Sequence, residues 1–139
     1  MKILGLDLGT KTLGIAVADS RLLMALPSDT WHFNDVSEII DKLIRYINEE
    51  NVVEIALGLP KNMDNSLGFA SKRSLDFKAM LEEKTDVPIV MVDERLSTME
   101  AENYLAQAGT FGTSRKKVID AVAASVILDT YLKMRGKKQ

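Results

Sequence analysis

Acidic residues stand at three places where the surrounding sequence is apolar. Asp7 interrupts the first apolar run of the chain, and Asp93 and Glu94 directly follow a later one. Asp120 lies near the end of the chain, and apolar or aromatic residues follow it at the helical spacings of three, four, seven and eleven positions. Burying a carboxylate in such surroundings is costly unless a cation or hydrogen bonds compensate for it. These positions therefore predict a site built from carboxylate oxygens.

Carboxylate oxygens are the preferred ligands of hard cations such as Mg²⁺ and Mn²⁺. Other chemistry is restricted, because 0 Cys and 1 His exclude a disulfide, a thiolate nucleophile and a cysteine-based zinc site. The single His32 is expected on the surface or on an edge strand. We therefore expect one or two divalent ions at the acids, where such ions activate water and stabilise the oxygens that attack and leave a phosphodiester.

Each acid also has an interpretation that involves no metal. Asp7 could accept hydrogen bonds from the glycine-containing turn that follows it. Asp93 and Glu94 could stabilise the N-terminus of a following helix, where negative charge interacts favourably with the helix dipole. Asp120 could pair with Lys116, although such helical pairs contribute only about 0.2–0.5 kcal/mol and leave the apolar surroundings unexplained. Convergence of all three groups at one sheet edge explains more than these separate roles.

The elements that position these acids follow from hydrophobic periodicity. Apolar runs at 2–8 and 13–18 flank a Gly-Thr-Lys-Thr turn and predict a β-hairpin. A third strand is expected within 22–33, at an edge because it contains Pro27. The remaining runs predict buried strands at 52–57 and 88–92 and helices at 36–47, about 68–84, 98–108 and 115–134.

This order predicts an α/β fold. Strands joined through helices run parallel whereas the opening hairpin is antiparallel, so we expect a mixed sheet flanked by helices. Alternation along the first strand places Asp7 on the same face as Ile3 and Gly5. Small alanines at 121, 123 and 124 would let the last helix approach the sheet closely, and Gly5 could receive it. The length of 139 residues, without a linker, predicts one domain spanning 1–139.

The distribution of charge singles out the end of the chain. Residues 1–114 carry 11 Lys/Arg and 18 Asp/Glu, whereas residues 115–139 carry 7 and 2, a net charge of +5. Such a basic segment is either a solvated helix with a lysine-rich end or a surface for a polyanion. No apolar run reaches the ~18 residues of a membrane helix, and no signal peptide is apparent, so we expect a cytoplasmic protein without membrane contact.

Four motifs together resemble the YqgF/RuvX family. They are Gly5-Leu-Asp7-Leu-Gly9-Thr-Lys-Thr-Leu-Gly14-Ile-Ala-Val-Ala-Asp19, Gly58-Leu-Pro-Lys-Asn-Met-Asp64, Asp93-Glu-Arg-Leu-Ser-Thr98 and Arg115-Lys-Lys-Val-Ile-Asp120-Ala-Val-Ala-Ala124. They occur in the family's order and span nearly the whole chain. The family's members are described as pre-16S rRNA nucleases or Holliday-junction resolvases. The resemblance implies an RNase H-like mixed five-stranded sheet with the first strand central and next to the 52–57 strand.

The resemblance also implies the catalytic, metal-binding set Asp7, Glu94 and Asp120. Glu94 is placed ahead of Asp93 because it resembles the family's second acid, whereas local periodicity does not separate the two. The sequence departs from the family pattern at Asn65, where a Gly is expected, and at Ser97, where Thr is more usual. These departures concern loop conformation and not the acids. Candidates for contact with the substrate are Lys11, Asn62, Arg95, Arg115, Lys116 and Lys117.

The sequence therefore predicts a Mg²⁺- or Mn²⁺-dependent nuclease that acts on structured nucleic acid, first of all at the 5′ end of pre-16S rRNA in ribosome biogenesis. One alternative is a resolvase of four-way DNA junctions, which would need two symmetry-related sites and hence a homodimer. Another is a non-catalytic RNA-binding assembly factor, against which the retained acids argue. The Asp7 turn also resembles the phosphate loop of actin- and hexokinase-type phosphotransferases, but those enzymes bind nucleotide between two such domains.

Overall fold

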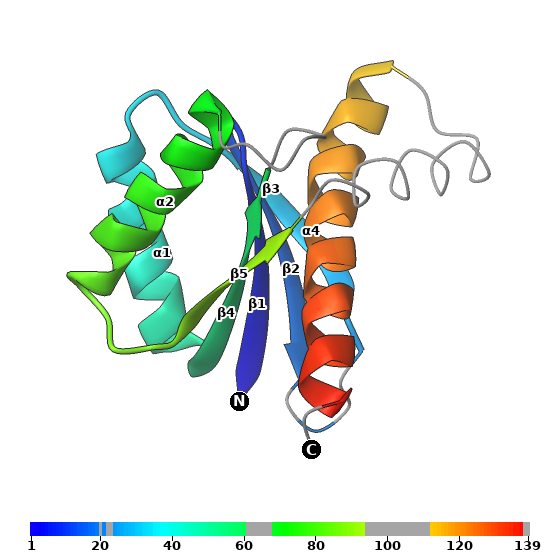
Figure 1. Cartoon of the computed structure of the whole chain (residues 1–139). Helices are drawn as coiled ribbons and strands as arrows, with labels where there is room; N and C mark the ends of the chain where they lie inside the picture. Colours follow the sequence, from blue (N-terminus) through cyan, green and yellow to red (C-terminus); the bar gives the residue numbers. More distant parts are fainter. Residues whose placement is uncertain (20, 22–23, 61–67, 94–111, 138–139) are drawn as a thin grey trace.

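The computed structural model describes residues 1–19, 21, 24–60, 68–93 and 112–137, with the backbone alone at 112–118, 136 and 137. Five strands form one sheet in the order β3-β2-β1-β4-β5 (Figure 1). The central strand β1 (Lys2–Leu8) pairs antiparallel with β2 (Thr12–Asp19) and parallel with β4 (Val52–Leu59). The edges are β3 (Leu26–His32), antiparallel to β2, and β5 (Ile89–Asp93), parallel to β4. The predicted mixed five-stranded sheet with a central first strand is confirmed.

Helices cover both faces of the sheet (Figure 1). On one side lie α1 (Val36–Glu49) and α2 (Phe69–Glu82), and on the other lies the long helix α4 (Gly112–Lys137). The predicted helix at 98–108 lies outside the described residues. No helix in the described ranges is long and apolar enough to cross a membrane.

Alternation along β1 separates the two cores. Leu4, Leu6 and Leu8 belong to the larger apolar cluster, which also contains the buried residues of α1 and α2. Ile3 belongs to the cluster that includes Ala124, Ile127 and Leu128 of α4. Because side chains of a strand point alternately to opposite faces, Gly5 and Asp7 share the α4 face with Ile3, as the sequence predicts.

Helix α1 begins where the sequence predicts. The side chain of Asp35 accepts a hydrogen bond from the backbone N–H of Ser37 at 3.0 Å, which satisfies one of the free donors of the first turn. Its buried residues lie at helical spacing on the sheet-facing side and are Ile39, Ile40, Leu43 and Ile47. Packing of this stripe against the leucines of β1 fixes one side of the strand that carries Asp7.

Helix α4 packs closely against the sheet. A β carbon added to Gly5 would lie 2.6 Å from both the backbone oxygen of Ala124 and the Cβ of Leu128, so only glycine permits this approach. At the other end of the helix, Arg135 Nη2 lies 3.0 Å from Glu54 Oε1 of β4, and the Tyr131 hydroxyl donates a hydrogen bond to the second oxygen of Glu54. The predicted role of Gly5 as receiver of the helix is confirmed.

Candidate active site

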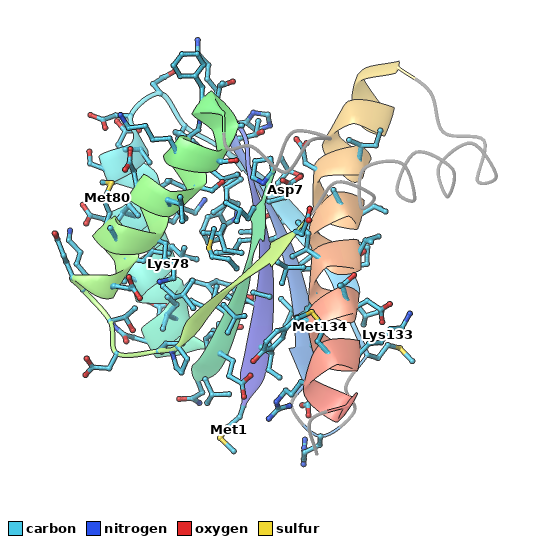
Figure 2. All side chains as sticks on the ribbon, viewed as in Figure 1. Met1, Asp7, Lys78, Met80, Lys133 and Met134 are labelled. Carbon is cyan, nitrogen blue, oxygen red and sulfur yellow. The ribbon has the colours of Figure 1, made fainter. Side chains whose placement is uncertain are left out.

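Asp7 is the last but one residue of β1, at the end of the sheet where β1, β4 and β5 all terminate. Figure 2 shows it at the upper end of the sheet, on the side of α4. Its side chain is half-buried, between the buried Leu6 and Leu8. The carboxyl ends of parallel strands are the usual position of ligand sites in α/β sheets.

Asp120 of α4 lies over the neighbour of Asp7 in the sheet. That neighbour is Gly14, which faces Asp7 directly in the antiparallel register. A β carbon added to Gly14 would lie 3.2 Å from the Cβ of Asp120 and 2.1 Å from its backbone oxygen. Facing residues of an antiparallel pair have Cβ positions only about 4.5–5.5 Å apart. Asp7 and Asp120 are therefore neighbours in space although 113 positions separate them.

Gly14 is the functional position that sequence reasoning missed. The sequence predicted that Gly5 receives the helix, and it does so at Ala124, whereas Asp120 rests on Gly14. The hairpin register was the signal available, because counting back from the turn places Gly14 opposite Asp7. Continuing the β1–β4 register by one residue past Leu57 places Gly58 on the other side of Asp7. Because Gly14 has no side chain, the backbone of Asp120 can lie directly on it, and Gly58 adds no side chain on the other side of Asp7.

Asp93 lies on the other face of the sheet. The preceding Val92 belongs to the α4 cluster, whereas Met91 packs against the cluster of α1 and α2. Because side chains alternate along a strand, Asp93 lies on the same face of the sheet as Met91, opposite to the face of Asp7. Its side chain is exposed. Asp7 and Asp120 are thus brought together and Asp93 is not, while Glu94 lies outside the described residues.

Those basic candidates that the structure describes lie at the end of the sheet that carries Asp7. Lys11 is exposed in the turn between β1 and β2, and its backbone carbonyl accepts a hydrogen bond from the N–H of Phe33 at 2.9 Å. Arg115, Lys116 and Lys117 belong to the first turns of α4, which precede Asp120 and extend past the end of β1. Their side chains, and the whole of Asn62 and Arg95, lie outside the described residues. The alternative pairing of Asp120 with Lys116 therefore stays open.

The residues present suit a hard divalent cation. Two acidic residues lie close together at this end of the sheet, and carboxylate oxygen is the donor that such cations prefer. Within the described ranges, no three residues of the metal-binding types form a cluster. A third acid would have to come from outside those ranges. His32, on the exposed end of edge strand β3, lies where the sequence predicts.

Comparison with known proteins identifies similar sequences along almost the whole chain. The family model described as "RuvX: Holliday junction resolvase" matches residues 1–134. A protein of Staphylococcus haemolyticus named "Putative pre-16S rRNA nuclease" is 48% identical over 134 residues, covering 94% of each chain. A protein of the same name from Staphylococcus epidermidis is 46% identical with the same coverage.

Solved structures share the fold at much lower sequence identity. The RuvC protein of Thermus thermophilus in complex with a Holliday junction substrate superposes with a TM-score of 0.61 at 16% identity, covering 99% of this chain and 96% of that one. The Fowlpox virus resolvase in complex with Holliday junction DNA gives a TM-score of 0.63 at 11% identity, with 97% and 99% covered. These likenesses concern the fold, and they confirm the predicted RNase H-like architecture.

Proposed function

Since the chain belongs to the RuvX family and is therefore a nuclease, we propose that it hydrolyses phosphodiester bonds of structured nucleic acid with the help of a divalent metal ion. The observation that carries this proposal is the meeting of Asp7 and Asp120 across Gly14 at the end of the sheet. We further propose that residues 1–139 form one nuclease domain that works in the cytoplasm.

Asp7, Glu94 and Asp120 would hold Mg²⁺ or Mn²⁺, as one ion or two. When bound, such ions activate water and offset the charge on the attacking and leaving oxygens. Glu94 is preferred over Asp93 because it resembles the family's second acid and because Asp93 lies on the α1–α2 face of the sheet, opposite to Asp7. Gly58 beside Asp7 adds no side chain to the space that the substrate phosphate would need.

The basic residues would bind and orient the substrate. Lys11 is exposed in the turn next to Asp7, where its ammonium group can contact a phosphate that flanks the cleaved bond. The start of α4 extends past Asp120 by about 1.5 Å per residue, which carries Arg115, Lys116 and Lys117 beyond the end of the sheet. Phosphate contacts of this kind position the nucleic acid and do not read its sequence. Asn62 and Arg95 complete the proposed set.

The proposed substrate is pre-16S rRNA, because the relatives that are 46–48% identical are named as nucleases of this RNA. The proposed cleavage site is the 5′ end of that precursor. A four-way DNA junction is the second candidate, favoured by the description of the family model. Junction resolution needs two symmetry-related sites and therefore a homodimer, whereas processing of rRNA does not.

Mapping of cleavage products on an rRNA precursor and on a four-way junction, each with Mg²⁺ or Mn²⁺, tests this proposal. We expect defined cleavage of the precursor by the parent and none by Asp7→Asn. Asp19→Asn is the matched control, because Asp19 ends β2 at the opposite end of the sheet and should not affect cleavage. Robust cleavage in excess chelator would refute the metal site. RNA binding without any cleavage would favour the non-catalytic assembly factor.

A further inference from the structure

A cavity lies at the same end of the sheet as Asp7 but on the other face. It has a volume of about 420 Å³, within the range typical of small-ligand sites. The turn after β1, the start of α1 and one side of α2 form its walls. The lining residues that enter the argument are Leu8, Asn34, Arg73, Asp76, Phe77 and Met80.

One stripe of α2 faces this pocket. Arg73, Asp76 and Met80 line it and are spaced as neighbours on a helix surface, and Phe69 precedes Arg73 by four residues on the same side. Phe69 therefore lies one turn beyond Arg73, toward the end of the molecule where β1 also ends (Figure 1). The stripe runs from an aromatic ring through a cation into an apolar cavity.

Phe69 is 91% exposed, the largest exposed fraction among the large hydrophobic residues of the described ranges. Folding leaves its ring in water, next to two cations, Lys72 and Arg73. Among the described residues, none forms an ion pair or hydrogen bond with the side chain of Arg73. An exposed aromatic ring beside cations is the arrangement with which proteins bind unpaired nucleotides, because the ring stacks on a base and the cations contact phosphates.

The interior of the pocket suits a base. Leu8, Phe77 and Met80 provide apolar walls, and Asn34 and Asp76 supply amide and carboxylate groups able to pair with polar edge atoms. The carboxylate of Asp76 disfavours a bare phosphate as the occupant and favours the amino or imino groups of a base. Arg73 remains for the phosphate of the same nucleotide.

The pocket and the acid pair are close along the chain. Leu8 lines the pocket, and the preceding residue, Asp7, faces α4. The turn of Gly9, Thr10 and Lys11 lies between the two faces. A nucleic-acid strand that crosses this turn would place one phosphate at Asp7 and a nearby nucleotide in the pocket.

We propose that this pocket binds an unpaired nucleotide of the substrate strand, with its base between Phe69 and the apolar walls and its phosphate on Arg73. The inference rests on the proposed function in that the strand is a nucleic acid. It adds that the substrate must be single-stranded or distorted next to the cleaved bond, because a paired and stacked base cannot enter a pocket.

Fluorescence anisotropy in chelator measures binding without cleavage. The probes are a short fluorescein-labelled single-stranded RNA and a blunt duplex of the same sequence. Phe69→Ala and Arg73→Ala should each weaken binding of the single strand by about tenfold or more and change duplex binding less. The matched controls on other sides of α2 are Leu75→Ala, an exposed apolar residue, and Lys78→Ala, a cation paired with Glu82, and neither should change either affinity.

Equal effects of Phe69→Ala and Leu75→Ala, or equal losses for single strand and duplex, would overturn the inference. Free uridine monophosphate serves as a competitor. If it binds as tightly as the RNA and its binding depends on Phe69 and Arg73, the occupant is a free nucleotide and the assignment to the substrate strand is wrong. Failure of the proposed function is seen separately, because a protein that cleaves nothing could still bind the single strand through Phe69 and Arg73.

Discussion

Gly14 of β2 lies directly beneath Asp120 of α4, so close that an added β carbon would stand 2.1 Å from the Asp120 backbone oxygen. Because Gly14 also faces Asp7 in the sheet, this one contact sets both the approach of the helix and the spacing of the two acids. The backbone oxygen cannot rotate away as a flexible side chain would. Any side chain at position 14 must therefore displace the helix or the strand.

Gly14→Ala should lower both stability and activity. Overpacking of a close contact typically costs about 1–3 kcal/mol, and we expect a loss of this size in the free energy of unfolding. The displaced helix carries Asp120 with it, so cleavage should fall even at temperatures where the variant is fully folded. Denaturant unfolding and cleavage rates of the same preparation measure the two effects.

Ile15→Val is the matched control for this loss of stability. Ile15 is the next residue of β2, and its side chain is buried on the opposite face against α1 and α2. The substitution should cost about 0.5–1.5 kcal/mol but leave cleavage by the folded protein unchanged. Normal cleavage by folded Gly14→Ala would show that the close contact does not position Asp120.

Asp120→Asn should separate stability from function. Acids gathered at a partly buried sheet edge repel one another without a cation, and the substitution removes one charge while nearly keeping the shape. We expect loss of cleavage, together with a melting temperature without divalent ions that equals or exceeds that of the parent. Mg²⁺ should raise the melting temperature of the parent more than that of the variant, because a ligand stabilises only the state that binds it.

Asp129→Asn is the control on the same helix, since Asp129 is paired with Lys133 at 3.0 Å away from the acid site. It should keep both cleavage and the response to Mg²⁺. If Asp120 instead has a structural partner such as Lys116, then Asp120→Asn should melt at a lower temperature and retain cleavage. Thermal melts with and without Mg²⁺ distinguish the two roles by opposite signs.

The meeting of Asp7 and Asp120 was within reach of sequence reasoning. Alternation placed Asp7 with Ile3 and Gly5, helical periodicity placed Asp120 with Ala124, and both placements hold in the structure. The order of strands came from the family resemblance instead, because the pairing of β1 with β4 joins segments that are distant in the chain, and local patterns carry no information about it.

The choice between Asp93 and Glu94 illustrates what local patterns lack. The residues before them are apolar at every position, so alternation has no polar face to reveal. Only the packing partners of Met91 and Val92 show on which face of the sheet each residue of β5 lies. A strand buried on both sides hides its orientation in the sequence, and tertiary contacts are needed to recover it.

The start of α4 should bind phosphates without reading sequence. Combined Arg115→Ala and Lys116→Ala should weaken binding of unrelated sequences similarly. The slope of log affinity against log salt concentration should shrink by about 0.7–0.9 for each phosphate that the double variant no longer neutralises. Lys84→Ala is the control, because Lys84 pairs with Asp41 at the other end of α2. An unchanged slope in the double variant would show that this segment does not bind the substrate backbone.

The contact that ties the end of α4 to the sheet contains a perturbed tyrosine. Burial and the hydrogen bond to Glu54 raise the pKa of Tyr131 to about 12, from an ordinary value of 10.0. Arg135, which pairs with the same carboxylate, opposes this shift but does not cancel it. The hydroxyl must therefore stay protonated to hold the helix end in place.

Stability should consequently decline at high pH through Tyr131. A raised pKa in the folded state means that its stabilisation is complete below pH 10, where the unfolded tyrosine begins to ionise, and is lost as pH rises through about 12. Tyr131→Phe should be less stable at neutral pH, because Glu54 loses a donor, but its stability should fall less steeply above pH 10.

Titration of tyrosinate absorbance checks the assignment, since only 3 tyrosines contribute and Tyr131→Phe should remove the component that titrates highest. In Glu54→Gln that component should titrate at lower pH, because the neighbouring negative charge is gone. A highest component that survives in Tyr131→Phe would assign the shift to another tyrosine and contradict the proposed contact.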